Sequence, residues 1–554
     1  MADGSGYFDL GGYSRPVTTQ APEAQVWFDR GLIWAYGFNH AEAVACFRRA
    51  LDADADCAMA WWGIAYASGP NYNKPWDDFD SEDLARSVRA AHEAAESARR
   101  LSAGATAVEQ ALIDALGRRC PSPLPNDEMD AWNHDWAAAM RQVYRAHPDD
   151  PDVQALFAEA LMNLTPWALW DLKTGRIADG ASTAEATDVL ESGMRARETS
   201  GGEPHAGLLH MYIHLMEMSP HPERAFGACE RLRNAVPDAG HLRHMPTHID
   251  VLCGDYASVV RTNEAAIAAD RKYLAREGAA NFYSLYRCHN FHFKIYGAMF
   301  LGQFEPALAA AEEMASGLPA DLLAMTSPPM ADWLEGFVPM KQHVLIRFGR
   351  WNDILALDLP EDRELFCVTT AMTRYAKAVA SAVIGDVEAA EREATAFETA
   401  LGHVPDSRYV FNNSCRDILA VAREMMHGEI AYRRGDVETA FRRLRRSVDL
   451  DDGLAYDEPW GWMQPTRHAL GALLLEQGRV EEAAAIYRAD LGYDATLSRA
   501  CQHPDNVWSL HGYLECLETL GRADEAAIVR PKLAIAMARA DVPVTASCFC
   551  RNSA

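Results

Sequence analysis

The chain has 554 residues, of which 52 are basic and 79 acidic, so its formal net charge is −27. This negative charge repels a polyphosphate backbone, and no basic stretch with interleaved aromatic residues offsets it, so nucleic acid is excluded as an expected partner. No apolar run approaches the roughly 18 residues that span a bilayer, so we expect no membrane partner either.

Cysteine usage and the start of the chain indicate the compartment. The 12 cysteines have no regular spacing, and residues 1–30 lack both the basic start and the apolar stretch of a signal peptide. We therefore predict a reducing, cytoplasmic location. Cys548 and Cys550 form only a weak metal motif, in a tail (residues 542–554) that we expect to be loose.

Helical periodicity dominates the chain, and strands should be nearly absent. Hydrophobic residues make up 49% of the sequence and recur with a period near 3.6. In chain order, helices are predicted over residues 23–37, 40–52, 57–65, 81–101, 153–164 and 183–199. Three prolines in residues 120–125 mark a linker, and residues 173–182 are predicted to be irregular.

Beyond residue 300, helical hairpins are marked by a glycine turn. Two residues after each glycine, an aromatic or small apolar residue opens the next helix. The turns are predicted at Gly302, Gly349, Gly385, Gly435, Gly478 and Gly521.

The spacing of the histidines reveals an internal repeat. Nine of the 19 histidines fall between His205 and His292. The distance from His210 to His244, and from His214 to His248, is 34 residues, which is the length of a tetratricopeptide (TPR) repeat. His292 follows His244 by 48 residues, which places an insertion of about 14 residues near residues 271–284.

These patterns predict an all-α fold, a TPR-like α-solenoid in which antiparallel helix pairs form a superhelix. We divide the chain into three regions. Residues 1–200 would form N-terminal hairpins with irregular loops, residues 201–320 the histidine-rich TPR units, and residues 321–554 the C-terminal hairpins and the loose tail.

The repeated histidines predict a metal site. Residues four apart share one face of a helix, so each pair projects in one direction, and neutral imidazole is the commonest metal-binding side chain. The predicted ligands are His210, His214, His244, His248, His289 and His292. The alternative is a hydrogen-bonded polar spine that fixes the curvature of the solenoid.

The predicted cofactor is a divalent transition metal, because six imidazoles without a Cys-x-x-Cys pair argue against a structural thiolate zinc site. Copper is favoured, and iron or zinc is possible. Three ligands per ion would give either two three-histidine centres or one such centre with further histidines behind it.

Three residues are candidates for catalysis. Glu217 lies three residues after His214 and is interpreted as a ligand, a general base or an orienter of an imidazole. Tyr283 and Tyr286, with Phe282, lie at the insertion and are predicted to form a lid or wall over the histidines.

Several phrases resemble a bacterial family of TPR-repeat proteins. They include His210-Met-Tyr-Ile-His214, His244-Met-Pro-Thr-His248-Ile249 and His289-Asn-Phe-His292. The resemblance covers nearly the whole chain and implies a fold rather than a reaction. Ordinary TPR modules bind peptides through a concave face lined with Lys, Arg and Asn, whereas His, Tyr and Glu217 are expected there in this chain.

The function predicted from these features is a metal-dependent enzyme acting on a small-molecule substrate in the groove of the solenoid. Oxidoreductase chemistry is favoured over hydrolysis because a site rich in histidine and poor in carboxylates favours copper or iron. The alternative is a non-catalytic TPR scaffold whose histidine-lined groove binds a protein or peptide.

Overall fold

The computed structural model describes residues 6–551. It divides into two compact units: unit 1 comprises Met1–Ile249 and Ala265–Tyr283, and unit 2 comprises Asp250–Glu264 and Ser284–Ala554. The chain passes between the units within three helices, α12 (Pro246–Leu252), α13 (Tyr256–Glu277) and α14 (Tyr283–Leu301). The two units are described separately.

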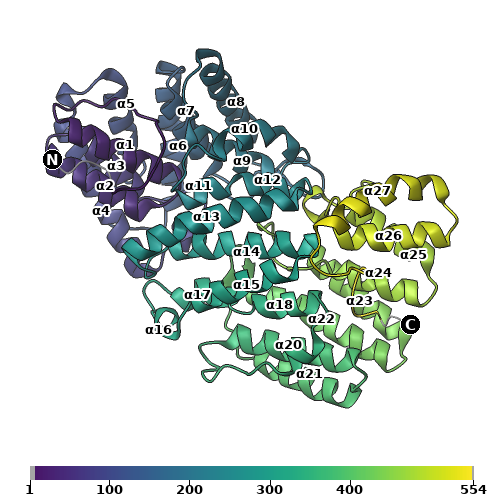
Figure 1. Ribbon diagram of the computed structural model, residues 1–554. Coiled ribbons are helices and arrows are strands. Elements are labelled where there is room, and N and C mark those ends of the chain that lie inside the picture. Colours follow the sequence, from purple (N-terminus) through teal and green to yellow (C-terminus); the bar gives the residue numbers. More distant parts are fainter. Residues whose placement is uncertain (1–5, 552–554) are drawn as a thin grey trace. The chain divides into compact units, whose positions relative to one another are not determined.

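The described part of unit 1 consists mainly of helices (Figure 1). It also contains one small strand pair. In chain order it contains α1 (Pro22–Tyr36), α2 (His40–Ala53), α3 (Ala58–Ala67), η1 (Trp76–Asp78), α4 (Ser81–Leu101), η2 (Ser102–Gly104), α5 (Ala107–Leu116), α6 (Met129–Ala146), α7 (Pro151–Met162), β1 (Trp170–Asp171), β2 (Arg176–Ile177), α8 (Thr183–Ser200), α9 (Ala206–Glu217), η3 (Pro222–Ala225), α10 (Phe226–Leu232) and α11 (Gly240–His244). The elements labelled η are short 3-10 helices. Strands β1 and β2 are antiparallel, with Trp170 opposite Ile177.

The described part of unit 2 likewise consists mainly of helices, with one small strand pair. It contains α15 (Phe304–Ser316), α16 (Ala320–Leu323), α17 (Met330–Leu334), η4 (Glu335–Phe337), α18 (Met340–Arg347), α19 (Trp351–Leu355), α20 (Cys367–Val383), α21 (Val387–Leu401), β3 (Tyr409–Val410), β4 (Asn413–Ser414), α22 (Cys415–Arg433), α23 (Val437–Asp452), α24 (Thr466–Glu476), α25 (Val480–Asp490), η5 (Arg499–Cys501), α26 (Val507–Thr519) and α27 (Ala523–Arg539). Strands β3 and β4 are antiparallel, with Tyr409 opposite Ser414.

The predicted fold class is confirmed: the protein is all-α and built from antiparallel helix pairs in the manner of a TPR-like α-solenoid. Consecutive helices such as α1 and α2, α20 and α21, and α22 and α23 pack against each other. Every predicted turn glycine has a positive φ, a conformation that disfavours residues with a Cβ. These angles are 72° at Gly302, 62° at Gly349, 93° at Gly385, 85° at Gly435, 72° at Gly478 and 70° at Gly521.

Local capping chemistry explains where the helices of unit 1 begin. The Asn39 side chain accepts a hydrogen bond from the backbone N–H of Glu42 at the start of α2. Thr106 and Glu109 form a capping box at α5. Asp150 caps α7, whose first residue is a proline. Each cap satisfies backbone N–H groups that lack a partner within the helix, so the side chain fixes the first turn.

The predicted loose tail is wrong for the residues that the structure describes. The backbone carbonyl of Ser547 accepts a hydrogen bond from Nη2 of Arg347 at 2.6 Å, and Nη1 of Arg551 lies 2.7 Å from the Glu515 carboxylate. Cys548 and Cys550 are joined by a disulfide. The tail packs because unit 2 supplies these polar partners. Residues 552–554 lie outside the described part of the chain.

Two further expectations concern the division of the chain into regions and the absence of a membrane-spanning segment. The division into residues 1–200, 201–320 and 321–554 stays a prediction. Among residues 6–551, no helix is both long enough and apolar enough to cross a membrane.

Candidate metal centre

Helix α9 is fixed at its first turn by a histidine. His205 caps it, because its Nδ1 accepts a hydrogen bond from the Leu208 backbone N–H at 3.1 Å. Its Nε2 therefore carries the proton and donates to Oδ1 of Asp152 at 3.1 Å. His210 and His214 follow one turn apart on the same face, and both side chains are completely buried.

The orientation of His210 is set by the last residue of α1. Its Nδ1 lies 2.6 Å from the backbone carbonyl oxygen of Tyr36, so Nδ1 donates and Nε2 keeps its lone pair. That Nε2 is buried and has no hydrogen-bond partner among the described residues. Burial lowers the pKa of His210 to about 3, so the imidazole is neutral at physiological pH.

Glu217 holds two imidazoles at once. Its Oε1 lies 2.8 Å from Nδ1 of His214, and its Oε2 lies 2.6 Å from Nδ1 of His248. The Nε2 atom of His214 is buried without a hydrogen-bond partner in the described chain. Burial holds the pKa of His214 well below its usual value. A carboxylate on Nδ1 is the usual device that fixes the tautomer and direction of a metal-binding histidine.

Helices α11 and α12 complete the imidazole cluster, which we define as His210, His214, His241, His244 and His248. One ring nitrogen from each of His210, His214 and His241 lies within 4.8 Å of the other two. The Nε2 atoms of His244 and His248 are 2.7 Å apart. The structure thus brings together the four predicted unit 1 histidines and Glu217.

His241 was missing from the predicted ligand set. Its ring lies 5.0 Å from that of His210, centroid to centroid. It precedes His244 by three residues, which puts both on one face of a helix, and this spacing was the available signal.

Aromatic side chains enclose the cluster. Phe38 lies 4.6 Å from the His210 ring, Tyr72 lies 5.1 Å from the His214 ring, and Trp167 lies 6.0 Å from it, all measured between ring centroids. Phe38 and Trp167 also have φ values of 56° and 57°. Bulky residues rarely adopt this left-handed conformation, and such strain concentrates at functional sites.

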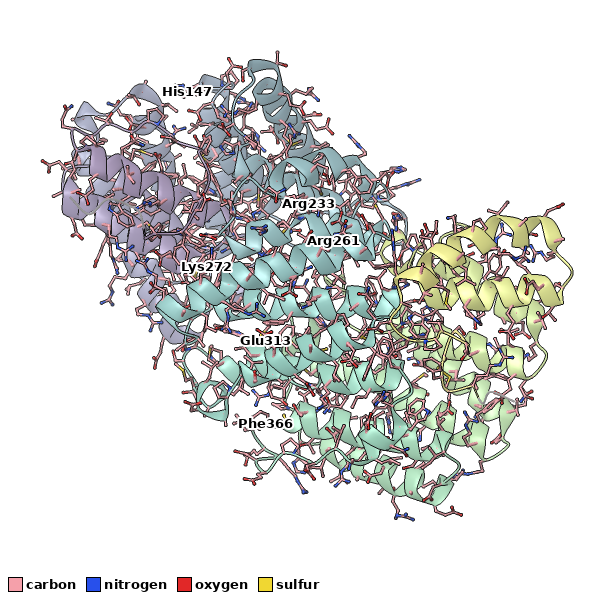
Figure 2. All side chains as sticks on the ribbon, in the orientation of Figure 1. His147, Arg233, Arg261, Lys272, Glu313 and Phe366 are labelled. Atoms are coloured by element: carbon pink, nitrogen blue, oxygen red, sulfur yellow. A yellow bond between two sulfur atoms is a disulfide. The ribbon has the colours of Figure 1, made fainter. Side chains whose placement is uncertain are left out.

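The start of α11 is held by contacts within unit 1. The Tyr283 hydroxyl donates to Oδ1 of Asp270 at 3.0 Å and accepts from the His241 backbone N–H at 3.2 Å. A Cβ at Gly240 would lie 1.9 Å from Oδ1 of Asp270, so a larger residue there would displace the Asp270 carboxylate. Just before α11, Asp238 accepts a hydrogen bond at 2.6 Å from Lys272 of α13, labelled in Figure 2.

These contacts predict the effect of Tyr283→Phe. The variant removes the hydroxyl that joins Asp270 to α11, and a lost buried hydrogen bond costs about 1–3 kcal/mol when its partners stay unsatisfied. We expect a decrease of that size in the free energy of unfolding, measured by urea denaturation. The control Tyr409→Phe, at an exposed position, should change it by less than about 0.5 kcal/mol.

The insertion predicted near residues 271–284 is mostly helical. Helix α13 continues to Glu277 and α14 begins at Tyr283, so only residues 278–282 connect them. Phe282 lies 4.7 Å from Nζ of Lys74. The extra length is mostly helical because residues 271–277 continue the 3.6-residue period. A catalytic role for Tyr283 and Tyr286 stays a prediction.

His289, His292 and Tyr286 belong to the part of α14 that lies in unit 2. His292 is completely buried, its ring lies 5.3 Å from that of Phe337, and burial lowers its pKa to about 3. The His289 ring lies 4.8 Å from that of Phe411. Metal ligation by His289 and His292 stays a prediction.

Comparisons with known proteins do not assign the chain to a family. No family model matches the chain, and no curated protein matches it. The solved structures that are similar to it include two that each share 12% sequence identity over 93% of this chain. One is Naa15/Naa10 bound to HypK-THB, of which 70% is covered with a TM-score of 0.21. The other is a circular tandem repeat protein with novel repeat topology and enhanced subunit contact surfaces, of which 88% is covered with a TM-score of 0.13.

Proposed function

We propose that unit 1 binds a divalent transition-metal ion through Nε2 of His210, Nε2 of His214 and a ring nitrogen of His241. The observation that carries this proposal is the pair of buried Nε2 atoms on α9, which have no hydrogen-bond partner in the described chain. Leaving buried polar atoms unsatisfied costs free energy, and a metal ion would satisfy both lone pairs.

The donor set favours copper over iron and zinc. All three donors are imidazoles, and copper(II) has the highest affinity of the divalent first-row metals for such ligands. Glu217 and the Tyr36 carbonyl keep the imidazoles in the tautomer that presents Nε2. Phe38, Tyr72 and Trp167 shield the His210 and His214 rings from water.

We further propose that the protein is a metal-dependent enzyme acting on a small-molecule substrate, with oxidoreductase chemistry favoured over hydrolysis. A bound copper or iron ion would supply one-electron chemistry, whereas the residues of this chain position and shield it. The strained backbones of Phe38 and Trp167 support an active site rather than a passive scaffold, because strain is retained where geometry matters.

Elemental analysis of freshly purified protein tests the metal site. We expect about one ion per chain, removed by a chelator and restored by copper(II) while the circular dichroism spectrum stays helical. Protein that holds no ion and fails to bind added copper(II), iron(II) or zinc(II) would refute the site and leave the TPR scaffold that binds a protein or peptide.

A further inference from the structure

Helix α27 of unit 2, labelled beside α26 in Figure 1, buries one side and exposes an apolar face on the other. The side that packs in unit 2 carries the buried residues Ala526, Val529 and Ala536. The opposite side carries apolar residues that are all exposed. We call them the outer face of α27, and they are Ala527, Ile528, Pro531, Ala534, Ile535 and Ala538.

Two large side chains dominate the outer face of α27. Ile528 is 66% exposed and Ile535 is 59% exposed. They are seven residues apart, which is about two helical turns, so they lie on the same side of the helix. Single exposed apolar residues are common on protein surfaces, whereas a contiguous apolar face marks an interaction site. In helical solenoids, a helix face that no neighbouring helix covers is normally polar.

The charges of α27 fall into two groups. Three of its five charged side chains form ion pairs within unit 2, namely Glu525 with Arg522, Arg530 with Glu518 and Lys532 with Asp505. The other two, Asp524 and Arg539, are exposed. Neither forms an ion pair with a residue that the structure describes. One opposite charge is therefore available at each end of the helix.

These two charges and the two isoleucines are arranged symmetrically along α27. Their order, at spacings of four, seven and four residues, is Asp524, Ile528, Ile535 and Arg539. These spacings keep all four on one side of a helix, and the midpoint of the arrangement lies beside Pro531. When two copies of α27 lie antiparallel with their midpoints together, Ile528 of each copy faces Ile535 of the other. Asp524 then faces Arg539 of the other copy.

We propose that the outer face of α27 binds a second copy of this chain, as an antiparallel pair of α27 helices related by a two-fold axis beside Pro531. Charge complementarity selects this occupant, because the antiparallel register brings an acid and a base together at both ends of the pair, whereas a parallel pair would place like charges opposite each other. Ala527, Ala534 and Ala538 add little bulk, so the two helices can approach closely. The pairing does not involve the imidazole cluster, so it is independent of the proposed metal site.

Sedimentation velocity of the purified chain over a series of concentrations tests the pairing. We expect a reversible monomer–dimer equilibrium with a dissociation constant of roughly 10–100 µM, because one helix pair buries less area than a standard protein interface. A chain that stays monomeric up to about 500 µM, several times that constant, would overturn the proposal and leave the outer face of α27 to a different protein.

The isoleucines locate the interface. Ile528→Asp should weaken dimerisation by more than about tenfold, because the two-fold symmetry places the substitution in the interface twice and each carboxylate would lose water there. Ile384→Asp changes another exposed isoleucine of unit 2, which is 51% exposed, and should leave the dissociation constant unchanged. Circular dichroism checks that both variants stay helical. Dimerisation that Ile528→Asp leaves unchanged, or that both variants weaken equally, would place the interface elsewhere and overturn the proposal.

Charge reversal tests the antiparallel register. Asp524→Arg and Arg539→Asp should each weaken dimerisation by about three- to tenfold, because each places like charges opposite each other at both ends of the pair. The double variant restores opposite charges and should return the dissociation constant to within about twofold of the wild-type value. Single reversals without effect, or a double variant that dimerises no better than the single reversals, would overturn the antiparallel pairing.

Discussion

Replacing His214 with alanine is expected to lower the affinity of the protein for copper(II) by more than about 100-fold. Removing a group that only orients a ligand already costs about 10–100-fold in metal affinity, so removing a ligand itself should cost more. His214 presents a buried Nε2 without a hydrogen-bond partner in the described chain, and His210→Ala should have the same effect for the same reason.

Glu217→Gln changes a residue that orients two histidines rather than a metal ligand itself, so its expected effect on copper affinity is smaller than that of His214→Ala. The amide keeps the shape of the side chain but removes the charge that holds Nδ1 of His214 and His248, so a decrease of about 10–100-fold is expected. His403→Ala, an exposed histidine in unit 2, should leave the affinity unchanged. Competition with a chelator of known affinity measures all four variants. If His403→Ala and His214→Ala lose metal equally, the binding is adventitious and the centre is wrongly placed.

The helices were predictable because their signals are local. The proline at the first position of α7, the cap at Asn39 and the turn glycines act within a few residues, so they can be recognised without knowledge of the fold. After each predicted turn glycine, the next helix begins two residues later, for example at Phe304 after Gly302 and at Val480 after Gly478.

The four histidines of unit 1 were predictable because the 34-residue repeat places His210 and His214 in the same register as His244 and His248. The groups that orient and enclose these histidines could not be predicted from the sequence. The Tyr36 carbonyl that orients His210 lies 174 residues earlier in the chain, and no periodic pattern connects the two positions. Phe38 and Trp167 are likewise brought to the cluster by the packing of helices that are distant in sequence.

Asp152 is the clearest example of such a residue, and replacing it has the largest expected effect on stability. One carboxylate oxygen accepts from the Tyr36 hydroxyl at 2.6 Å and from His205 at 3.1 Å. The other accepts from Arg15 at 2.6 Å and from Tyr13 at 2.8 Å. The whole residue is only 2% exposed. It therefore joins the N-terminal segment, α1, α7 and α9 in one buried network.

The pKa of Asp152 shows how this network responds to acid. Burial alone would raise its pKa, but the hydrogen bond from His205, together with the charge of Arg15 and the hydrogen bond from the Tyr36 hydroxyl, outweighs burial and holds the pKa well below its usual range. A carboxylate with a depressed pKa stabilises the fold above its unfolded-state pKa, near 3.9, and loses that contribution as pH falls further. The network should therefore weaken below about pH 4.

Asp152→Ala is expected to lower the free energy of unfolding by about 3–5 kcal/mol at pH 7, because it leaves buried donors and part of the Arg15 charge without a partner. It should also flatten the decline in stability below about pH 4, since the titrating group is gone. Urea denaturation at several pH values, followed by circular dichroism, measures both effects. Asp149→Ala, at an exposed neighbouring position, is the matched control and should change stability by less than about 0.5 kcal/mol. A change of that small size for Asp152→Ala, or an unchanged acid response, would mean that the buried network does not hold α1 against α9.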